Sequence, residues 1–170
     1  MSAAFVLVRA VTYASLFIGF LLVFVPARLL SWSGVTRPAV SGAVQATGML
    51  LTATGAALDL WCIFTFALRG KGTPAPFDPP RRLVVRGPYG FIRNPMYLGA
   101  AIALAGAALF YESAALAAYA GTFLLMTHAF VVWYEEPTLR ATFGAEYDGY
   151  CSQVRRWWPR LRGGRPSTKR

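Results

Sequence analysis

The sequence predicts an all-α membrane protein, a polytopic helical bundle of about four transmembrane helices followed by a C-terminal amphipathic helix. Hydrophobic residues make up 56% of its 170 residues and charged residues only 14%, whereas soluble domains carry about 25% charged residues. The apolar residues lie in four segments, each close to or above the ~17 residues that cross a bilayer. The segments are 3–25, 40–68, 96–111 and 114–134.

The first two segments predict an N-terminal helix pair over residues 1–69. No basic region precedes the first apolar stretch, and no small-residue cleavage site follows it. We therefore expect a retained anchor helix and not a secretory signal. Cys62 lies in the second segment and Cys151 in the basic tail, so the two thiols are expected at different depths and are not assigned to a disulfide.

Residues 70–94 are rich in Gly and Pro, which predicts an extended cytoplasmic loop with no helix before Asn94. Asn is a favoured N-cap and Pro suits the first helical position, so the third helix is expected to start at Pro95. Its first turn offers unpaired backbone N–H groups and a positive dipole end, which favour an anionic ligand group. Residues 95–134 are expected to form a helix hairpin.

Residues 135–162 predict a cytoplasmic cap helix and an interfacial anchor. Leu139, Phe143, Tyr147 and Tyr150 recur at spacings of four, four and three residues, which places them on one face of one helix. The anchor combines aromatic rings with cations that face lipid headgroups. Its residues are Trp157 and Trp158 with Arg155, Arg156, Arg160 and Arg162. Residues 163–170 are expected to be a disordered tail.

The positive charge of the chain is concentrated beside the predicted membrane segments. Of 17 Lys and Arg residues, six lie at 69–93 and eight at 140–170. Two crossings separate these stretches, so the positive-inside rule places both on the cytoplasmic side together with the N-terminus. We therefore expect a multi-pass protein of a bacterial inner membrane with both termini cytoplasmic, whose partners are membrane lipids and a lipophilic substrate. Nucleic acid is not expected as a partner, no metal-ligand cluster is visible, and the oligomeric state stays open.

Several polar residues near or within the apolar segments could carry function. Paired carboxylates at Glu135 and Glu136, directly after an apolar helix, require a compensating cation or polar ligand. Asp59 lies inside the second segment, where an acid is costly, so it either has a function or pairs with another helix. His128, inside the fourth segment, is expected to pack or to hydrogen-bond between helices and receives no catalytic role.

The third segment is rich in Gly and Ala between Gly99 and Ala108. Small residues allow close helix packing, but they also leave room for an apolar ligand. Both alternatives stay open, and a groove beside Gly99 and Ala103 would give a lipophilic acceptor a route from the bilayer.

Two runs of the sequence, GTPAPFDPPRRLVVRGPYGFIRNPMYLG and EEPTLRATFGAEYDGYCSQVRRWWP, resemble one family of membrane enzymes. The family is that of the isoprenylcysteine carboxyl methyltransferases and phospholipid methyltransferases, and the resemblance spans residues 72–159. It implies transfer of a methyl group from S-adenosyl-L-methionine to a lipophilic carboxylate, thiol or amine. The cofactor would lie in a cytoplasmic pocket capped by the tail.

The resemblance also implies which residues form the site. Carried over by position, the cofactor contacts fall on Arg81, Arg82, Leu83, Val84, Tyr89, Asn94, Pro95, Met96, Tyr97 and Glu135. Glu135 and Tyr97 are the candidate catalytic residues, and no metal is implied. The chain departs from the family at Asn94, where His is usual, and at Val131, where the eukaryotic carboxyl methyltransferases have a substrate-holding Arg.

Two other functions remain as alternatives. A membrane reductase with a related C-terminal pattern would bind NADPH, and a small four-helix transporter could use Asp59 for proton coupling. Binding of S-adenosylhomocysteine and of NADPH separates the three possibilities, because the transporter should bind neither and the reductase only the second.

The charge distribution makes a direct prediction about topology. Reporters fused after Arg170 and inserted near Thr73 should both report the cytoplasm, whereas one near Thr36 should report the opposite side. A signal from the opposite side at Thr73 alone would contradict the arrangement of four crossings.

Overall fold

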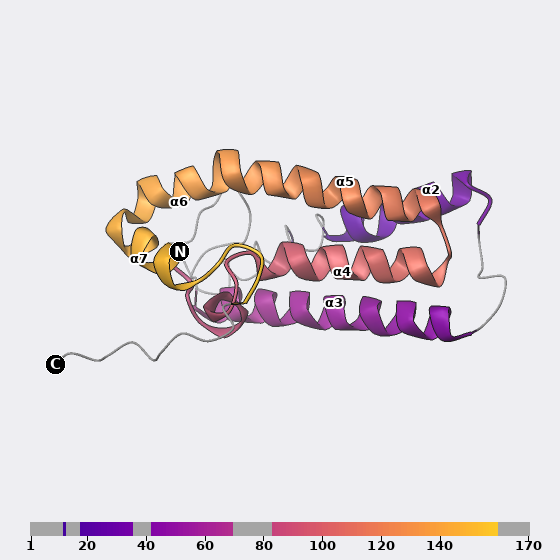
Figure 1. Cartoon of the computed structure of the whole chain (residues 1–170), viewed down its shortest axis with the longest axis horizontal. Helices are drawn as coiled ribbons and strands as arrows, with labels where there is room; N and C mark the ends of the chain where they lie inside the picture. Colours follow the sequence, from indigo (N-terminus) through magenta and orange to yellow (C-terminus); the bar gives the residue numbers. More distant parts are fainter. Residues whose placement is uncertain (1–11, 13–17, 36–41, 70–82, 160–170) are drawn as a thin grey trace.

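The computed structural model describes residues 12, 18–35, 42–69 and 83–159, and this part of the chain is helical without a β-sheet. Three long helices lie side by side: α3 (Ala43–Arg69), α4 (Pro95–Phe110) and α5 (Ala114–Phe130) (Figure 1). Helix α4 lies between the other two and packs against both. The predicted all-α class is confirmed for the described residues. We call the end of this bundle where α3 ends and α4 begins the strap end, after the C-terminal segment 154–158 that lies there.

Two of the described helices are long and apolar enough to cross a membrane. They are Ala43–Phe66 and Ala114–Phe143, and two shorter apolar helices, Gly19–Trp32 and Pro95–Phe110, accompany them. Large apolar side chains point outward, with Leu125 73% exposed and Trp133 79% exposed. Exposed apolar faces of this size suit contact with lipid. Four transmembrane helices remain a prediction.

Helices α3 and α4 meet through two pairs of glycines. Gly48 lies against the backbone of Gly106, and Gly55 lies against the backbone of Gly99, so a Cβ at any of these positions would overlap the facing helix or, at Gly99, also a side chain. The two glycines on each helix are seven residues apart and therefore share one face. The small residues of α4 thus provide close packing, which is the usual basis of helix association in a membrane.

The alternative of an acceptor groove beside Gly99 and Ala103 is wrong, because α3 covers that face of α4. An apolar groove of about 620 Å³ lies instead between α4 and α5, toward the end of the bundle opposite the strap end. Small residues such as Ala105 and Gly121 line it, with Glu112 at its polar margin.

The predicted hairpin between α4 and α5 is present and turns at Glu112 and Ser113. Glu112 has a positive φ of 50°, and the Ser113 side chain caps α5 by accepting a hydrogen bond from Leu116 N at 3.3 Å. Gln45 Nε2 donates to Glu112 Oε1 at 2.8 Å, which ties the first turn of α3 to this hairpin.

Two helices contain a proline near their start, and a π-helical turn directly precedes each of them. The π-helix η1 (Gly19–Phe24) leads into α2 (Val25–Trp32), which contains Pro26, so this helix continues past the expected end at residue 25. The π-helix η3 (Val131–Glu135) leads from α5 into α6 (Glu136–Phe143), which contains Pro137. Proline lacks the N–H of an α-helical hydrogen bond and clashes with the preceding turn, and the wider π turn accommodates both defects.

The C-terminal region differs from the single expected helix. Helix α6 stops at Gly144, whose φ is +52°, and α7 (Ala145–Gln153) follows. The four expected apolar residues still converge, because the chain folds back at this glycine and packs Leu139 and Phe143 against Tyr147 and Tyr150. The residues expected as a tail at 163–170, and Arg160 and Arg162, lie outside the described residues.

The loop before α4 also differs from an extended chain. A 3-10 turn, η2 (Gly87–Gly90), forms because Gly87 takes a φ of +63° and Pro88 supplies the next φ. A Cβ at Gly87 would press against the Thr65 side chain of α3. The turn therefore packs closely on the last part of α3.

A matched pair of glycines tests the close packing. Gly106→Ala should destabilise the protein by about 1–3 kcal/mol, because the added methyl group overlaps the backbone of α3. Gly121→Ala meets open space and should cause no loss. Thermal unfolding in detergent measures both, and equal melting temperatures would contradict the glycine-mediated contact.

Candidate functional site

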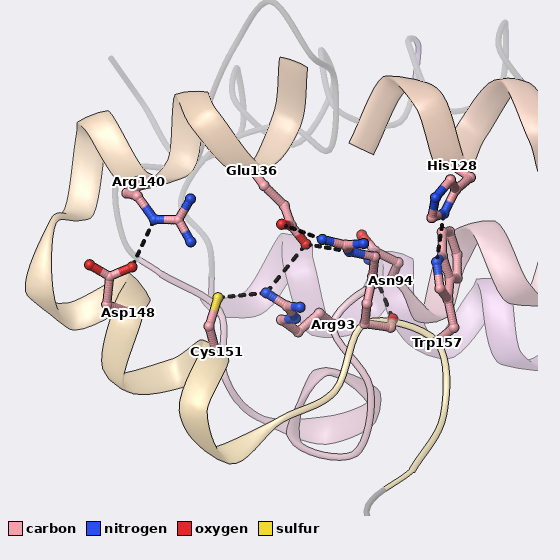
Figure 2. A network of polar contacts seen from close by, with 9 residues as sticks. Arg93, Asn94, His128, Glu136, Arg140, Asp148, Cys151 and Trp157 are labelled. Carbon is pink, nitrogen blue, oxygen red and sulfur yellow. Dashed lines mark hydrogen bonds and ion pairs between the residues drawn. The ribbon is translucent and has the colours of Figure 1, made fainter. Parts of the chain in front are cut away.

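A short C-terminal segment crosses the start of α4. We call residues 154–158 the C-terminal strap. The backbone N–H of Arg93 donates to the carbonyl of Arg155 at 2.9 Å. Asn94 Nδ2 donates to the carbonyl of Arg156 at 3.4 Å (Figure 2). The strap therefore runs beside the residues that lead into α4, although 62 residues separate Asn94 from Arg156 in the sequence.

One carboxylate holds the strap to the end of the apolar helix. Arg156 donates from Nε and Nη2 to Glu136 Oε1 and Oε2 at 2.7 and 2.8 Å, and Arg93 Nη1 lies 3.3 Å from Glu136 Oε1. The Glu136 side chain is only 10% exposed, so it depends on these cations. The expected compensating cation is confirmed, whereas the expectation that Arg156 faces lipid headgroups is wrong, since its guanidinium is bound by Glu136.

The distal part of the strap is held by an aromatic residue. Trp157 Nε1 donates to His128 Nδ1 at 3.1 Å, and Figure 2 shows the two rings side by side. His128 was expected to pack or to bond to another helix, but its hydrogen-bond partner lies on the strap, which is not helical. Trp158 is 75% exposed, which leaves it available for the interfacial position expected for it.

The two candidate catalytic residues meet at the strap end. The Tyr97 hydroxyl donates to Glu135 Oε2 at 2.9 Å, joining the first turns of α4 to the end of η3. Tyr97 is the one hydrogen-bond partner of Glu135 within the described part of the chain. No described residue donates a hydrogen bond to the second carboxylate oxygen, Oε1.

Tyr89 lies at the centre of the same group. Burial raises the pKa of its hydroxyl well above the usual value, and the nearby Cys62, Glu135, Tyr150 and Tyr97 raise it further. The hydroxyl therefore stays protonated at neutral pH and acts as a hydrogen-bond donor. The carbonyl of Tyr89 accepts a hydrogen bond from the Tyr150 hydroxyl at 2.6 Å, which fixes the η2 turn beneath α7.

The structure places most of the other predicted cofactor contacts at or near the start of α4. Pro95 begins α4, as predicted, and is fully buried, while Met96 is half-buried beside it. Asn94 is the N-cap residue by position, but its side chain makes no capping hydrogen bond and turns to the strap. Leu83 packs against the tyrosine cluster of α7, and Val84 is buried. Arg81 and Arg82 lie outside the described residues.

Sequence reasoning missed the residues that assemble the site. It treated Arg93 and Arg156 as cations of the membrane boundary, and it gave Cys62 no role. The adjacent carboxylates at Glu135 and Glu136 were the available signal, because two buried acids at one helix end need nearby donors. The pairing itself was not visible, since the donors lie 20 and 43 positions from Glu136 in the sequence.

These features define a membrane protein with a polar site at one end of an apolar bundle. The family model described as "Phospholipid methyltransferase" matches residues 44–146, which is more than half of the chain. The chain therefore belongs to the phospholipid methyltransferase family and is a membrane methyltransferase by family. Comparisons with curated proteins and with solved structures gave no match.

The strap makes a testable prediction about local stability. Arg156→Ala should increase hydrogen exchange in residues 154–159, because hydrogen bonds to a charged group contribute about 1.5–3 kcal/mol. Arg140→Ala, which breaks the exposed Arg140–Asp148 pair, is the matched control and should change little. Mass-spectrometric hydrogen exchange in detergent measures both, and unchanged exchange in Arg156→Ala would show that the pair does not hold the strap.

Proposed function

We propose that the protein transfers a methyl group from S-adenosyl-L-methionine to a lipophilic acceptor at the cytoplasmic face of the membrane. The family match supports methyl transfer. The observation that carries the position of the site is the hydrogen bond between Tyr97 and Glu135 Oε2 beneath the C-terminal strap, which leaves Glu135 Oε1 without a partner among the described residues.

The groups around this pair fit S-adenosyl-L-methionine chemically. The free oxygen of Glu135 suits the ribose hydroxyls or the ammonium group, and the rings of Tyr89 and Tyr97 suit the sulfonium or the adenine. The N-terminal N–H groups of α4 suit a carboxylate. Asn94 contributes through its backbone position, because its side chain is bound to the strap. Arg81, Arg82, Leu83, Val84, Pro95 and Met96 remain proposed contacts from the resemblance.

The bound cofactor supplies a methyl group that is already activated by the positive sulfur. The residues of the chain therefore have to position the acceptor and exclude water more than to generate a strong nucleophile. In this proposal Tyr97 orients the Glu135 carboxylate, and the strap covers the polar side of the site. The acceptor, a lipophilic carboxylate, thiol or amine, arrives from the bilayer side.

The proposed membrane arrangement follows from the charge distribution. Four helices cross a bacterial inner membrane with both termini in the cytoplasm, because the basic residues cluster at 69–93 and 140–170. The strap end then faces the cytoplasm, where S-adenosyl-L-methionine is made. The reductase and the transporter are not favoured, since the family match points to methyl transfer.

Substitutions at the tyrosine–carboxylate pair test this proposal. Glu135→Gln and Tyr97→Phe should weaken binding of S-adenosylhomocysteine by roughly ten- to a hundredfold, because each removes part of a hydrogen-bonded charged contact. Glu146→Gln, on the exposed face of α7, is the control and should leave affinity unchanged.

Calorimetric titration of the purified protein with S-adenosylhomocysteine and with NADPH gives the result. Unchanged affinity in Glu135→Gln would remove Glu135 from the site. Binding of NADPH but not S-adenosylhomocysteine by the parent protein would support the reductase instead.

A further inference from the structure

The apolar groove between α4 and α5 is large enough to hold a ligand. Its volume is about 620 Å³, within the ~300–1,000 Å³ typical of small-molecule sites. Ala105 of α4 and Ala117 and Gly121 of α5 are exposed along it, and a Cβ at Gly121 would meet nothing within 4 Å. The side chains of its walls are therefore too small to fill the space between the two helices.

The shape of the groove follows the helix axes. Its small residues recur at spacings of three and four residues on both helices, so each wall is one continuous helix face. On α5 the lining extends from Ala114 to Leu124, which corresponds to about 15 Å along the helix. The groove is thus elongated in the direction in which lipid chains lie in a bilayer. The small residues are Ala101, Ala105 and Ala108 on α4, and Ala114, Ala117 and Gly121 on α5.

A single acid stands at one end of this groove. Glu112 is the only acidic residue among the described residues that line it. Gln45 Nε2 donates to Glu112 Oε1 at 2.8 Å, and Gln45 Oε1 accepts from the backbone N–H of Gly42 at 3.0 Å. Because Gln45 is only 5% exposed and both ends of its amide are bound, it holds the carboxylate at the mouth of the groove. No described residue donates to Glu112 Oε2, and no described Lys or Arg forms an ion pair with it.

Glu112 lies close to the membrane boundary that is farther from the strap. Helix α4 has 16 residues, or about 24 Å, which is somewhat less than the ~30 Å hydrocarbon core. The Tyr111 ring precedes Glu112 directly, and tyrosine is enriched at membrane–water interfaces. A molecule in the groove would therefore have its apolar part between the helices and its polar part beside the carboxylate.

We propose that this groove binds one acyl chain of a phospholipid whose ammonium head group pairs with Glu112. An acyl chain gains little by leaving lipid for an apolar groove, so the head group decides which lipid stays. The carboxylate attracts an ammonium group and repels a head group that carries only negative charge. The proposal is independent of methyl transfer, because the groove opens at the end of the bundle opposite Tyr97 and Glu135.

A second copy of the chain is the other candidate occupant, but its charge does not complement the groove. Two copies with the same orientation in the membrane, related by a twofold axis along the membrane normal, would carry Glu112 at the same depth. Contact along the groove would then bring two carboxylates together, and like charges repel strongly in a medium of low dielectric constant. A lipid with an ammonium head group supplies the opposite charge.

The test uses the full-length protein, purified in detergent and freed of lipid. Native mass spectrometry measures binding of dioleoyl phosphatidylcholine and dioleoyl phosphatidylglycerol, which have the same acyl chains. The nitrogen of phosphatidylcholine is already fully methylated, so its binding is not that of a methyl acceptor. The parent protein should prefer phosphatidylcholine by about tenfold, and Glu112→Gln should remove this preference. Glu146→Gln, on the exposed face of α7, is the control and should keep it.

A second set of variants tests the groove itself. Gly121→Leu and Ala105→Leu each fill part of the groove and should weaken binding of both lipids at least tenfold. Thr122→Leu adds bulk to an exposed position of α5 outside the groove and should leave both affinities unchanged. The melting temperature of each variant shows whether it is folded.

Three results would overturn the proposal. The first is equal affinity of the parent for the two lipids, which needs no variant. The second is unchanged lipid binding in folded Gly121→Leu and Ala105→Leu proteins. The third is a parent dimer that becomes a monomer in Gly121→Leu with unchanged lipid binding, since this would assign the groove to a second copy. Affinity for S-adenosylhomocysteine should be the same in all of these variants, so a failure of the proposed methyl transfer is measured separately.

Discussion

The polar end of this protein depends on the contact between Glu136 and Arg156. The carboxylate belongs to a helix that continues directly from an apolar span, and the guanidinium belongs to a segment without regular structure. Two parallel hydrogen bonds join them in a geometry that a carboxylate and a guanidinium satisfy well. Because this contact fixes the strap, the backbone N–H of Arg93 and the side chain of Asn94 can form hydrogen bonds with it. The strap therefore covers the start of α4.

The apolar part of the bundle is organised by a different force. Lipid removes the hydrophobic drive for helices to associate, so α3 and α4 rely on close contact between backbones, which their facing glycines permit. The same close contact places the Asp59 side chain against Gly99, near the beginning of α4. Packing deep in the bundle and charge pairing at its end thus meet around Tyr89, Tyr97 and Glu135.

Much of the helical framework could be predicted from sequence because it depends on local signals. The run of apolar residues predicted α3, α4 and α5, and the Asn94–Pro95 pair predicted the first residue of α4. Contacts between distant residues were not predictable in this way. The break at Gly144 was missed because the spacing of Leu139, Phe143, Tyr147 and Tyr150 fits one continuous helix equally well. The direction of the Asn94 side chain was missed because its partner, the carbonyl of Arg156, is a backbone atom that carries no sequence signal.

The π-helical turn before Pro137 sets the angular phase of the two carboxylates. A π turn holds about one residue more than an α turn, and one residue rotates everything that follows by roughly 100° about the helix axis. Glu135 and Glu136 therefore meet Tyr97 and Arg156 only because this extra residue is present. The exposed side chains of α5 are apolar on several sides, so a rotation of this helix about its axis would still present an apolar surface. Residues 131–135 are consequently intolerant of a change in length even where a change in side chain is harmless.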